Sequence, residues 1–276
     1  MTEPTLPPFE TLALRLDGAV AVLSLNRPDK ANAMNWPMWQ ELRAAAQWAD
    51  RTPEVRALVL RAEGPHFTAG IDLKMMMGLQ QQIQDDCEAR VREKLHGLIL
   101  ELQDCLSALE RCRKPILAAV HGACLGGGVD LLCCTDLRYC SADAHFAIKE
   151  IDIGMVADVG TLQRLPKLIG HQGLVRELAY TGREMAAPEA LQCGWVTRVF
   201  DDREALDAGV LALAQQIAAK SPLAVRGSKQ ALNYARDHSV ADGLQQIASW
   251  NAGLLLSEDL MKALMAGRGA PPQFRD

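Results

Sequence analysis

Short runs of apolar residues that alternate with longer amphipathic segments constrain the fold of this 276-residue chain most strongly. Three of the runs are AVAVLSL at 19–25, RALVLR at 56–61 and PILAAV at 115–120. Continuously apolar runs of this length are typical of strands that are buried on both faces. Further strand-like runs lie at 136–140, 145–148 and 195–200, and helical patterns lie at 36–48 and 87–112. This alternation predicts an α/β core.

The strand signal stops near residue 200. Four helical patterns follow, at 201–220, 222–236, 240–255 and 258–266. We therefore predict two regions, an α/β core at 1–200 and a helical C-terminal region at 201–276. The apolar side chains of the second region can pack either on the core or on another subunit, and the sequence leaves both possibilities open.

Composition excludes several functional classes. A net charge of -5 and an aromatic content of 5% disfavour nucleic-acid binding. No uninterrupted apolar run of about 18 residues exists, which argues against a membrane span. The eight cysteines lie mostly in apolar segments without CxxC spacing, so we expect buried thiols in a reducing compartment, the cytoplasm. Phosphate-loop, nucleophile-elbow and paired-histidine motifs are also missing, so we expect no cofactor and no metal.

Two glycine-rich turns follow two of the predicted strands. The first is FTAGIDL at 67–73, and the second is HGACLGGGVD at 121–130, which opens a helix. Glycines at a helix N-terminus leave N–H groups that point outward. Two such turns on neighbouring strands can direct two N–H donors at one carbonyl oxygen, which is an oxyanion hole. Alternatively, both turns are tight connections in which glycine serves helix–strand packing.

Three carboxylates are candidates for acid–base chemistry. Asp130 lies one turn into the helix that the glycines open, Glu150 follows a strand, and Asp158 lies in an apolar loop before a predicted helix. Burial among apolar neighbours raises a carboxyl pKa and suits it to proton transfer. Structural roles remain open for each of them, namely helix-dipole complementation, a surface position and an N-cap. Asp72, Asp136 and Asp152 receive only the structural interpretation.

The chain resembles the crotonase superfamily, the enoyl-CoA hydratase/isomerase family, from about residue 10 to residue 265. The resemblance rests on LNRPDKANAM at 25–34, HFTAGIDL at 66–73, PILAAVHGACLGGGVDL at 115–131 and the acidic stretch at 149–160. It implies an α/β fold, a crotonase-like spiral of ββα units, with a helical C-terminal region that forms trimers or hexamers. It also implies an acyl-CoA thioester substrate, in which CoA is part of the substrate rather than a cofactor.

The resemblance also assigns binding roles. The amides of Ile71 and Gly127 would hold the thioester oxygen. The substrate-binding residues would be Ala69, Gly70, Ile71, Asp72, Leu73 and Gly127. Arg27 and Lys30 are candidate contacts for the nucleotide portion of CoA, although a solvated surface loop explains them equally well.

Within the superfamily, KEIDIGMVADVGTLQRLPKLIG at 149–170 and RDHSVADGLQQIASWN at 236–251 resemble the Δ3,5-Δ2,4-dienoyl-CoA isomerases of unsaturated fatty-acid β-oxidation. Their Asp, Glu, Asp set corresponds to Asp130, Glu150 and Asp158. The resemblance implies that Asp158 is the base at carbon 2, that Glu150 is the acid at carbon 6, and that Asp130 shapes the pocket. Alternatives are an enoyl-CoA hydratase that uses Glu150 and Asp130, and a non-catalytic binding protein; the additional Asp158 argues against the hydratase.

Overall fold

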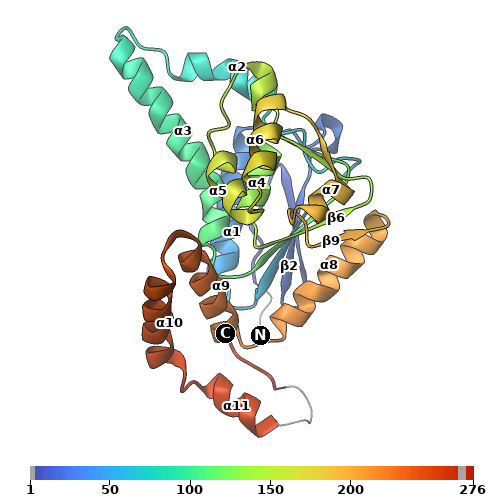
Figure 1. The fold of residues 1–276 in the computed structure, drawn as a ribbon, viewed down its shortest axis with the longest axis vertical. Helices are drawn as coiled ribbons and strands as arrows, with labels where there is room; N and C mark the ends of the chain where they lie inside the picture. The colour runs from blue at the N-terminus through green and yellow to red at the C-terminus, as the bar shows by residue number, and fades with distance from the viewer. Residues whose placement is uncertain (1–3, 267–271) are drawn as a thin grey trace.

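The computed structural model describes residues 4–266 and 272–276, and its main feature is a six-stranded sheet (Figure 1). The strand order is β1-β2-β3-β4-β6-β9. β1 runs antiparallel to β2, whereas every other neighbouring pair is parallel. The strands are β1 (Leu12–Asp17), β2 (Val20–Leu25), β3 (Ala57–Ala62), β4 (Ile116–Val120), β6 (Leu137–Ser141) and β9 (Arg198–Phe200). A mixed sheet with helical crossovers confirms the predicted α/β class.

The central strands are buried on both faces because their side chains alternate between two apolar clusters. In β2, Val22 lies in one cluster and Leu23 lies in the other. The first cluster is covered by α8 (Arg203–Ala218), which contacts five strands of the sheet. The second cluster is the larger one and includes residues of α1 (Trp36–Arg51) and α3 (Glu88–Arg111). This two-sided burial explains the continuously apolar runs.

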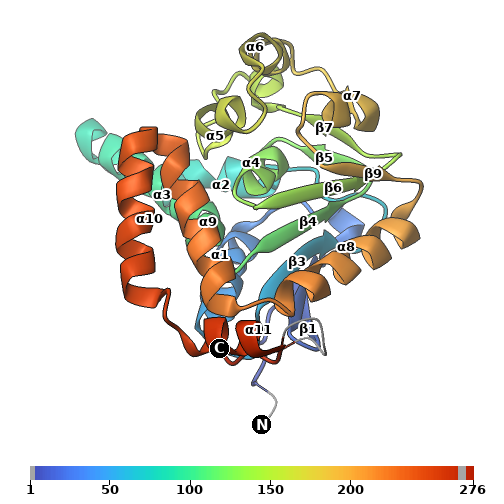
Figure 2. The same cartoon turned by 60° about the horizontal axis from the view of Figure 1, so that its bottom comes forward.

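A second, three-stranded sheet includes part of the second glycine turn, in its strand β5. It consists of β5 (Ala123–Leu125), β7 (His145–Ala147) and β8 (Met185–Ala186), in that order. It lies above the main sheet in Figure 2, next to α4 (Gly127–Cys133). Every residue of α4 is buried, so this short helix is fixed by packing on all sides.

The remaining helices before β9 surround this second sheet and one end of the core. α3 and the loop before it extend beyond the rest of the body in Figure 1. The other elements are α2 (Leu73–Gln82), α5 (Thr161–Leu168), α6 (Gln172–Thr181), α7 (Ala187–Gln192) and the short 3-10 helices η1 (Pro28–Lys30) and η2 (Glu150–Ile153).

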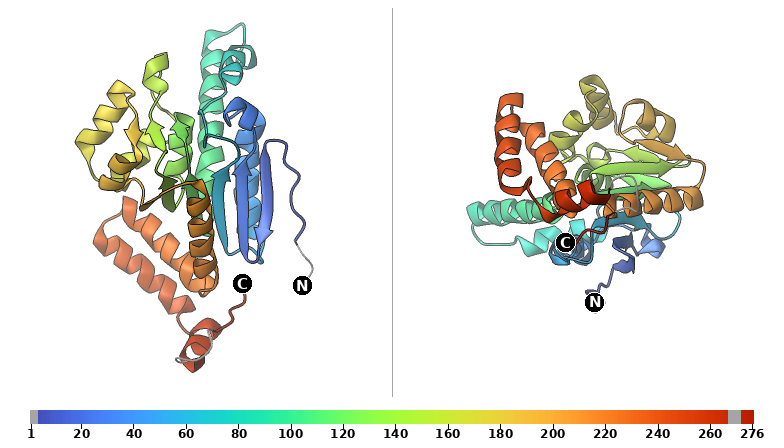
Figure 3. Two further views of the ribbon diagram at one scale, coloured as in Figure 1. Left: turned by 90° about the vertical axis from the view of Figure 1, so that its right-hand side faces the viewer. Right: turned by 90° about the horizontal axis from the view of Figure 1, so that it is seen from below.

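The C-terminal helices confirm the predicted change of character near residue 200. They are α9 (Pro222–Asp237), α10 (Val240–Leu254) and α11 (Glu258–Ala266). Figure 3 shows α10 and α11 standing away from the sheet. α9 contacts the core, where Lys229 donates a hydrogen bond to the Lys114 carbonyl at 3.0 Å and pairs with Asp136 at 2.8 Å. α8 instead packs on the main sheet, so the division into 1–200 and 201–276 stays a prediction. Residues 1–3 and 267–271 of those two regions lie outside the described residues.

Two further sequence expectations concern the thiols and the membrane. All eight cysteines are free, six of them buried. Across residues 4–266 and 272–276, no helix combines the length and apolar character needed to span a bilayer.

Candidate active site

A cavity of about 660 Å³ lies beside the two glycine turns. One wall consists of apolar side chains of α2 and α3, among them Met76, Leu98 and Leu102. Residues of the segment 149–159, which follows β7, also line the cavity. The cavity is therefore mainly apolar and has its polar groups at a few defined places, as small-molecule sites do.

Backbone hydrogen bonds hold the two turns side by side. The Thr68 amide donates to the Ala123 carbonyl at 3.0 Å, and the Leu125 amide donates to the Thr68 carbonyl at 3.0 Å. On its other side the first turn pairs with Met34, whose amide donates to the Gly70 carbonyl at 2.7 Å. The first turn is thus fixed between the chain that precedes α1 and the chain that precedes α4.

This pairing leaves two amides free, those of Ile71 and Gly127. In the parallel bridge between Met34 and Ile71, the Asp72 amide donates to the Met34 carbonyl at 3.1 Å, so the Ile71 amide points the other way. Gly127 is the first residue of α4, where an amide has no intrahelical acceptor. In the described part of the chain neither amide has an acceptor, and both residues line the cavity.

The glycines bring these amides together. A Cβ on Gly127 would lie 3.8 Å from the Ile71 nitrogen. Gly70 has φ +87, and a Cβ there would lie 2.7 Å from the Leu125 carbonyl oxygen, so no larger residue fits. Two adjacent, unpaired N–H groups at the wall of an apolar cavity have the arrangement of an oxyanion hole.

Glu150 reaches the cavity from the first residue of η2. A Cβ on Gly126 would lie 3.1 Å from Glu150 Oε1, which places this carboxyl group against the second glycine turn. Its Oε2 atom is buried and has no partner within the described residues. Burial, followed by the negative charge of Asp130, raises the pKa of Glu150 to about 7.

Asp158 lines the same cavity from the loop before α5. Its backbone carbonyl accepts a hydrogen bond from the Gln103 side chain of α3 at 2.6 Å, which fixes the loop. Burial raises the pKa of Asp158 above its ordinary value. Asp158 also borders a second, more polar cavity lined by Gln103, Ser107 and Gln163.

Asp130 does not line the cavity but lies behind it. It is fully buried in α4, and its Oδ1 accepts a hydrogen bond from the Thr161 amide at 2.6 Å. Its Oδ2 has no partner among the described residues. Burial raises the pKa of Asp130 to about 6, with a further contribution from the charge of Asp158. The three predicted acids therefore influence one another electrostatically, and Asp130 acts from outside the cavity.

Replacing Asp130 with Asn is expected to make stability less sensitive to pH. In the folded protein the pKa of Asp130 is about 6, above the ordinary aspartate value of 3.8, so wild-type stability falls as pH rises between these values. Asn has no charge to bury. The free energy of unfolding of the variant, relative to that of the wild type, should therefore rise by about 2–3 kcal/mol between pH 4 and pH 8. Urea unfolding at fixed protein concentration measures this difference, and a pH-independent difference would contradict it.

Arg27 and Asp72 line the cavity and form an ion pair at 3.0 Å. Asp72 also caps α2 by accepting a hydrogen bond from the Lys74 amide at 2.9 Å. Partial burial acts to raise the pKa of Asp72, but the hydrogen bond from Arg27 and those from the helix lower it overall. Lys30 is exposed and lines the cavity as well. Lys149 is a further cation at this cavity that sequence reasoning did not single out.

The structure thus brings most of the predicted site residues to one cavity. The residues that line it are Arg27, Lys30, Ala69, Ile71, Asp72, Leu73, Gly127, Glu150 and Asp158. Gly70 and Asp130 instead lie behind the cavity wall, the first shaping a turn and the second in α4.

The fold is that of the crotonases. It matches a crystal structure of enoyl-CoA hydratase subunit I from Geobacillus kaustophilus with a TM-score of 0.84 and 34% identity, covering 95% of this chain and 97% of that one. Residues 15–255 match the family model described as enoyl-CoA hydratase/isomerase. The chain belongs to the enoyl-CoA hydratase/isomerase family.

Two relatives carry a more specific name. The mitochondrial Delta(3,5)-Delta(2,4)-dienoyl-CoA isomerase of Homo sapiens is 50% identical over 244 residues, which are 88% of this chain and 74% of that protein. The peroxisomal Delta(3,5)-Delta(2,4)-dienoyl-CoA isomerase of Arabidopsis thaliana is 42% identical over 267 residues, 96% of each chain. These names overturn the expectation of a cytoplasmic protein. Buried free thiols do not distinguish the cytoplasm from other reducing compartments.

Proposed function

We propose that this protein is an isomerase that converts 3,5-dienoyl-CoA thioesters to 2,4-dienoyl-CoA thioesters in the β-oxidation of unsaturated fatty acids. The observation that carries the proposal is that Glu150 and Asp158 share one apolar cavity, and both have a raised pKa. The relatives that bear this activity in their names are 42–50% identical over most of the chain. The reaction moves protons only, so we propose that it needs no cofactor and no metal.

The chemistry needs two proton-transfer groups and one oxyanion site. A base removes a proton from carbon 2, and the electron pair spreads over the thioester oxygen and carbons 2, 4 and 6. An acid then delivers a proton to carbon 6, which leaves double bonds at carbons 2 and 4. Carbons 2 and 6 are too far apart for one side chain to serve both easily, so two carboxyl groups on a bent acyl chain suit the task.

We assign the base to Asp158 and the acid to Glu150. A pKa of about 7 keeps much of Glu150 protonated near neutral pH, as a proton donor requires. Asp130 raises the Glu150 pKa by its charge and so supports the donor from behind the cavity. The amides of Ile71 and Gly127 would bind the thioester oxygen, where one such donor is typically worth about 3–4 kcal/mol to the transition state.

Arg27 and Lys30 remain candidate contacts for the anionic nucleotide portion of CoA. Both lie at the cavity, although Arg27 is already paired with Asp72. Lys30 pairs with Asp29 at 3.6 Å, but both side chains are exposed, so this weak pair can exchange for a phosphate.

The direct test supplies the purified protein with a 3,5-dienoyl-CoA and, separately, with a 2-enoyl-CoA. Isomerisation should produce strong ultraviolet absorbance from the newly conjugated 2,4-diene and thioester. If only the 2-enoyl-CoA reacts, by gaining water, the protein is a hydratase and the proposal is wrong.

We further propose that the chain assembles as a trimer or a pair of trimers through its C-terminal helices. None of the residues of α10 is buried, and Leu244, Leu256 and Leu264 are 64%, 92% and 68% exposed. Covering such side chains favours association. Light scattering after gel filtration should give the mass of three or six chains, and a monomer mass at micromolar concentration would contradict this proposal.

A further inference from the structure

Thr68 lies at the point where the two glycine turns meet, and its side chain is fully buried. Its Oγ1 accepts a hydrogen bond from the Gly70 amide at 3.1 Å and donates one to the Asn32 carbonyl at 2.7 Å. The hydroxyl therefore ties the first turn to the loop that precedes α1. Gly70 directly precedes Ile71, so this bond acts one residue from a free amide.

The methyl group of Thr68 contacts the second turn. A Cβ on Gly128 would lie only 2.4 Å from Thr68 Cγ2 and 3.0 Å from Cys124 Sγ. The third glycine of the triplet thus leaves the space that the Thr68 methyl fills. Thr68 therefore sets the distance between the two turns through its side chain as well as through its backbone bonds.

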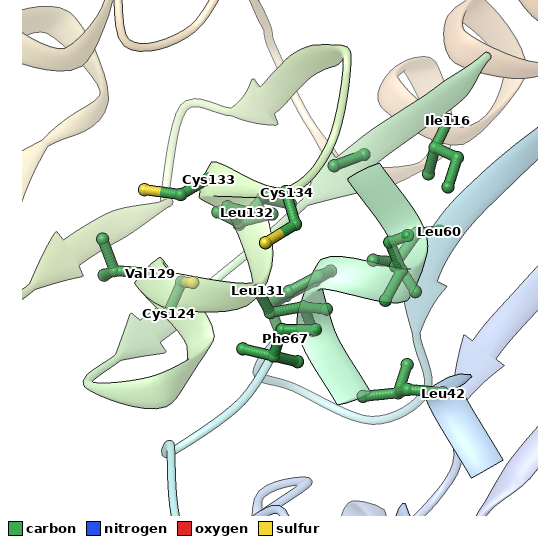
Figure 4. Close-up of a cluster of buried hydrophobic side chains, with 14 of the residues drawn as sticks. Leu42, Leu60, Phe67, Ile116, Cys124, Val129, Leu131, Leu132, Cys133 and Cys134 are labelled. Atoms are coloured by element: carbon green, nitrogen blue, oxygen red, sulfur yellow. The ribbon is translucent and has the colours of Figure 1, made fainter. Parts of the chain in front are cut away.

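The turns cannot move inward to compensate for a change at Thr68. Phe67, which precedes it, and Cys124 on the second turn are both completely buried. Figure 4 shows these side chains among the packed leucines of the core. Because the core is close-packed, a change at Thr68 will shift the exposed sides of the turns, where the amides lie.

We propose that Thr68 is a positioning residue that holds the amides of Ile71 and Gly127 at the spacing and direction needed to bind one oxyanion. This role rests on the proposed function, because it concerns the same thioester oxygen. Oxyanion donors act only within a narrow distance range, and a misplacement of about 1 Å can cost about 10²-fold in rate.

Two substitutions separate the contribution of the Thr68 hydroxyl from that of its methyl group. Thr68→Val keeps the shape and removes both hydrogen bonds, so kcat should fall by about 10- to 100-fold with little change in KM. Thr68→Ser keeps the hydroxyl and should retain most of the rate. Thr52→Val is the control, because Thr52 donates a partly buried hydrogen bond of the same length to the Trp48 carbonyl, 2.7 Å, away from the cavity. It should leave kcat unchanged.

A spectroscopic measurement reports on the oxyanion site itself. A bound 2,4-dienoyl-CoA should absorb at longer wavelength than the free compound, because two N–H donors polarise its conjugated carbonyl. Thr68→Val should reduce this shift at equal occupancy, whereas loss of stability alone would not. If the wild type shows the shift but does not isomerise 3,5-dienoyl-CoA, the proposed function fails and the positioning role stands. A full shift and full kcat in Thr68→Val would overturn that role.

The methyl contact has its own test, which also serves if Thr68→Val does not fold. Gly128→Ala forces a methyl against Thr68 and should reduce both kcat and the spectral shift. In the Thr68→Ser background the opposing methyl is gone, so Gly128→Ala should lower kcat and the spectral shift by less. Equal losses in both backgrounds would show that the contact does not position the second turn.

Discussion

Replacing Asp158 with Asn is expected to lower kcat for 3,5-dienoyl-CoA by about 10²- to 10⁴-fold, the usual contribution of a general base. The amide is nearly isosteric but cannot accept a proton from carbon 2. The loop should keep its place, because it is fixed through the Asp158 backbone carbonyl and Gln103 rather than through the carboxylate. Stopped-flow or steady-state absorbance at the wavelength of the 2,4-diene measures the rate.

Binding separates a lost base from a damaged site. The Kd of Asp158→Asn for 2,4-dienoyl-CoA should stay close to that of the wild type, since the oxyanion amides and the apolar walls are unchanged. Asp143→Asn is a suitable control, because Asp143 is exposed on the turn between β6 and β7 and does not line the cavity. Retention of most of the rate in Asp158→Asn would remove Asp158 from the reaction.

The parts of the fold that sequence alone predicted are those whose burial leaves a pattern along the chain. Strands β2, β3 and β4 appear as apolar runs because each is covered on both sides. Strand β1 was missed because it is an edge strand, and its sequence LALRLD alternates between apolar and polar residues. A search for period-two alternation would have found it. Helix α2 has no buried residue, so core periodicity did not reveal it.

The candidate site divides in the same way. Asp130 and Asp158 could be singled out from their apolar neighbours, Glu150 from its place after a strand, and the glycine turns from their spacing. The contacts that hold these residues in place could not be predicted from the sequence. Thr68 bonds to Asn32, 36 residues away in sequence, and packs against Gly128 of helix α4. Such contacts exist only after distant segments meet, and a threonine beside a glycine turn carries no local signal of them.

Glu150→Gln is expected to stop isomerisation as completely as Asp158→Asn, with kcat lower by about 10²- to 10⁴-fold, because Gln has no proton to give to carbon 6. Glu184→Gln, on the exposed chain before β8, should leave kcat unchanged. A near-normal rate in Glu150→Gln would exclude Glu150 as the acid.

The two variants should differ in one partial reaction, which reveals the direction of proton transfer. In deuterated water, Glu150→Gln retains Asp158, so it should still exchange the protons at carbon 2 of 3,5-dienoyl-CoA without moving the double bonds. The polar cavity on the other side of Asp158 offers this carboxyl group a path to solvent for that exchange. Asp158→Asn should exchange nothing at carbon 2. Mass spectrometry of recovered substrate measures both, and the opposite pattern would reverse the roles of the two acids: Glu150 would then take the proton and Asp158 would return it.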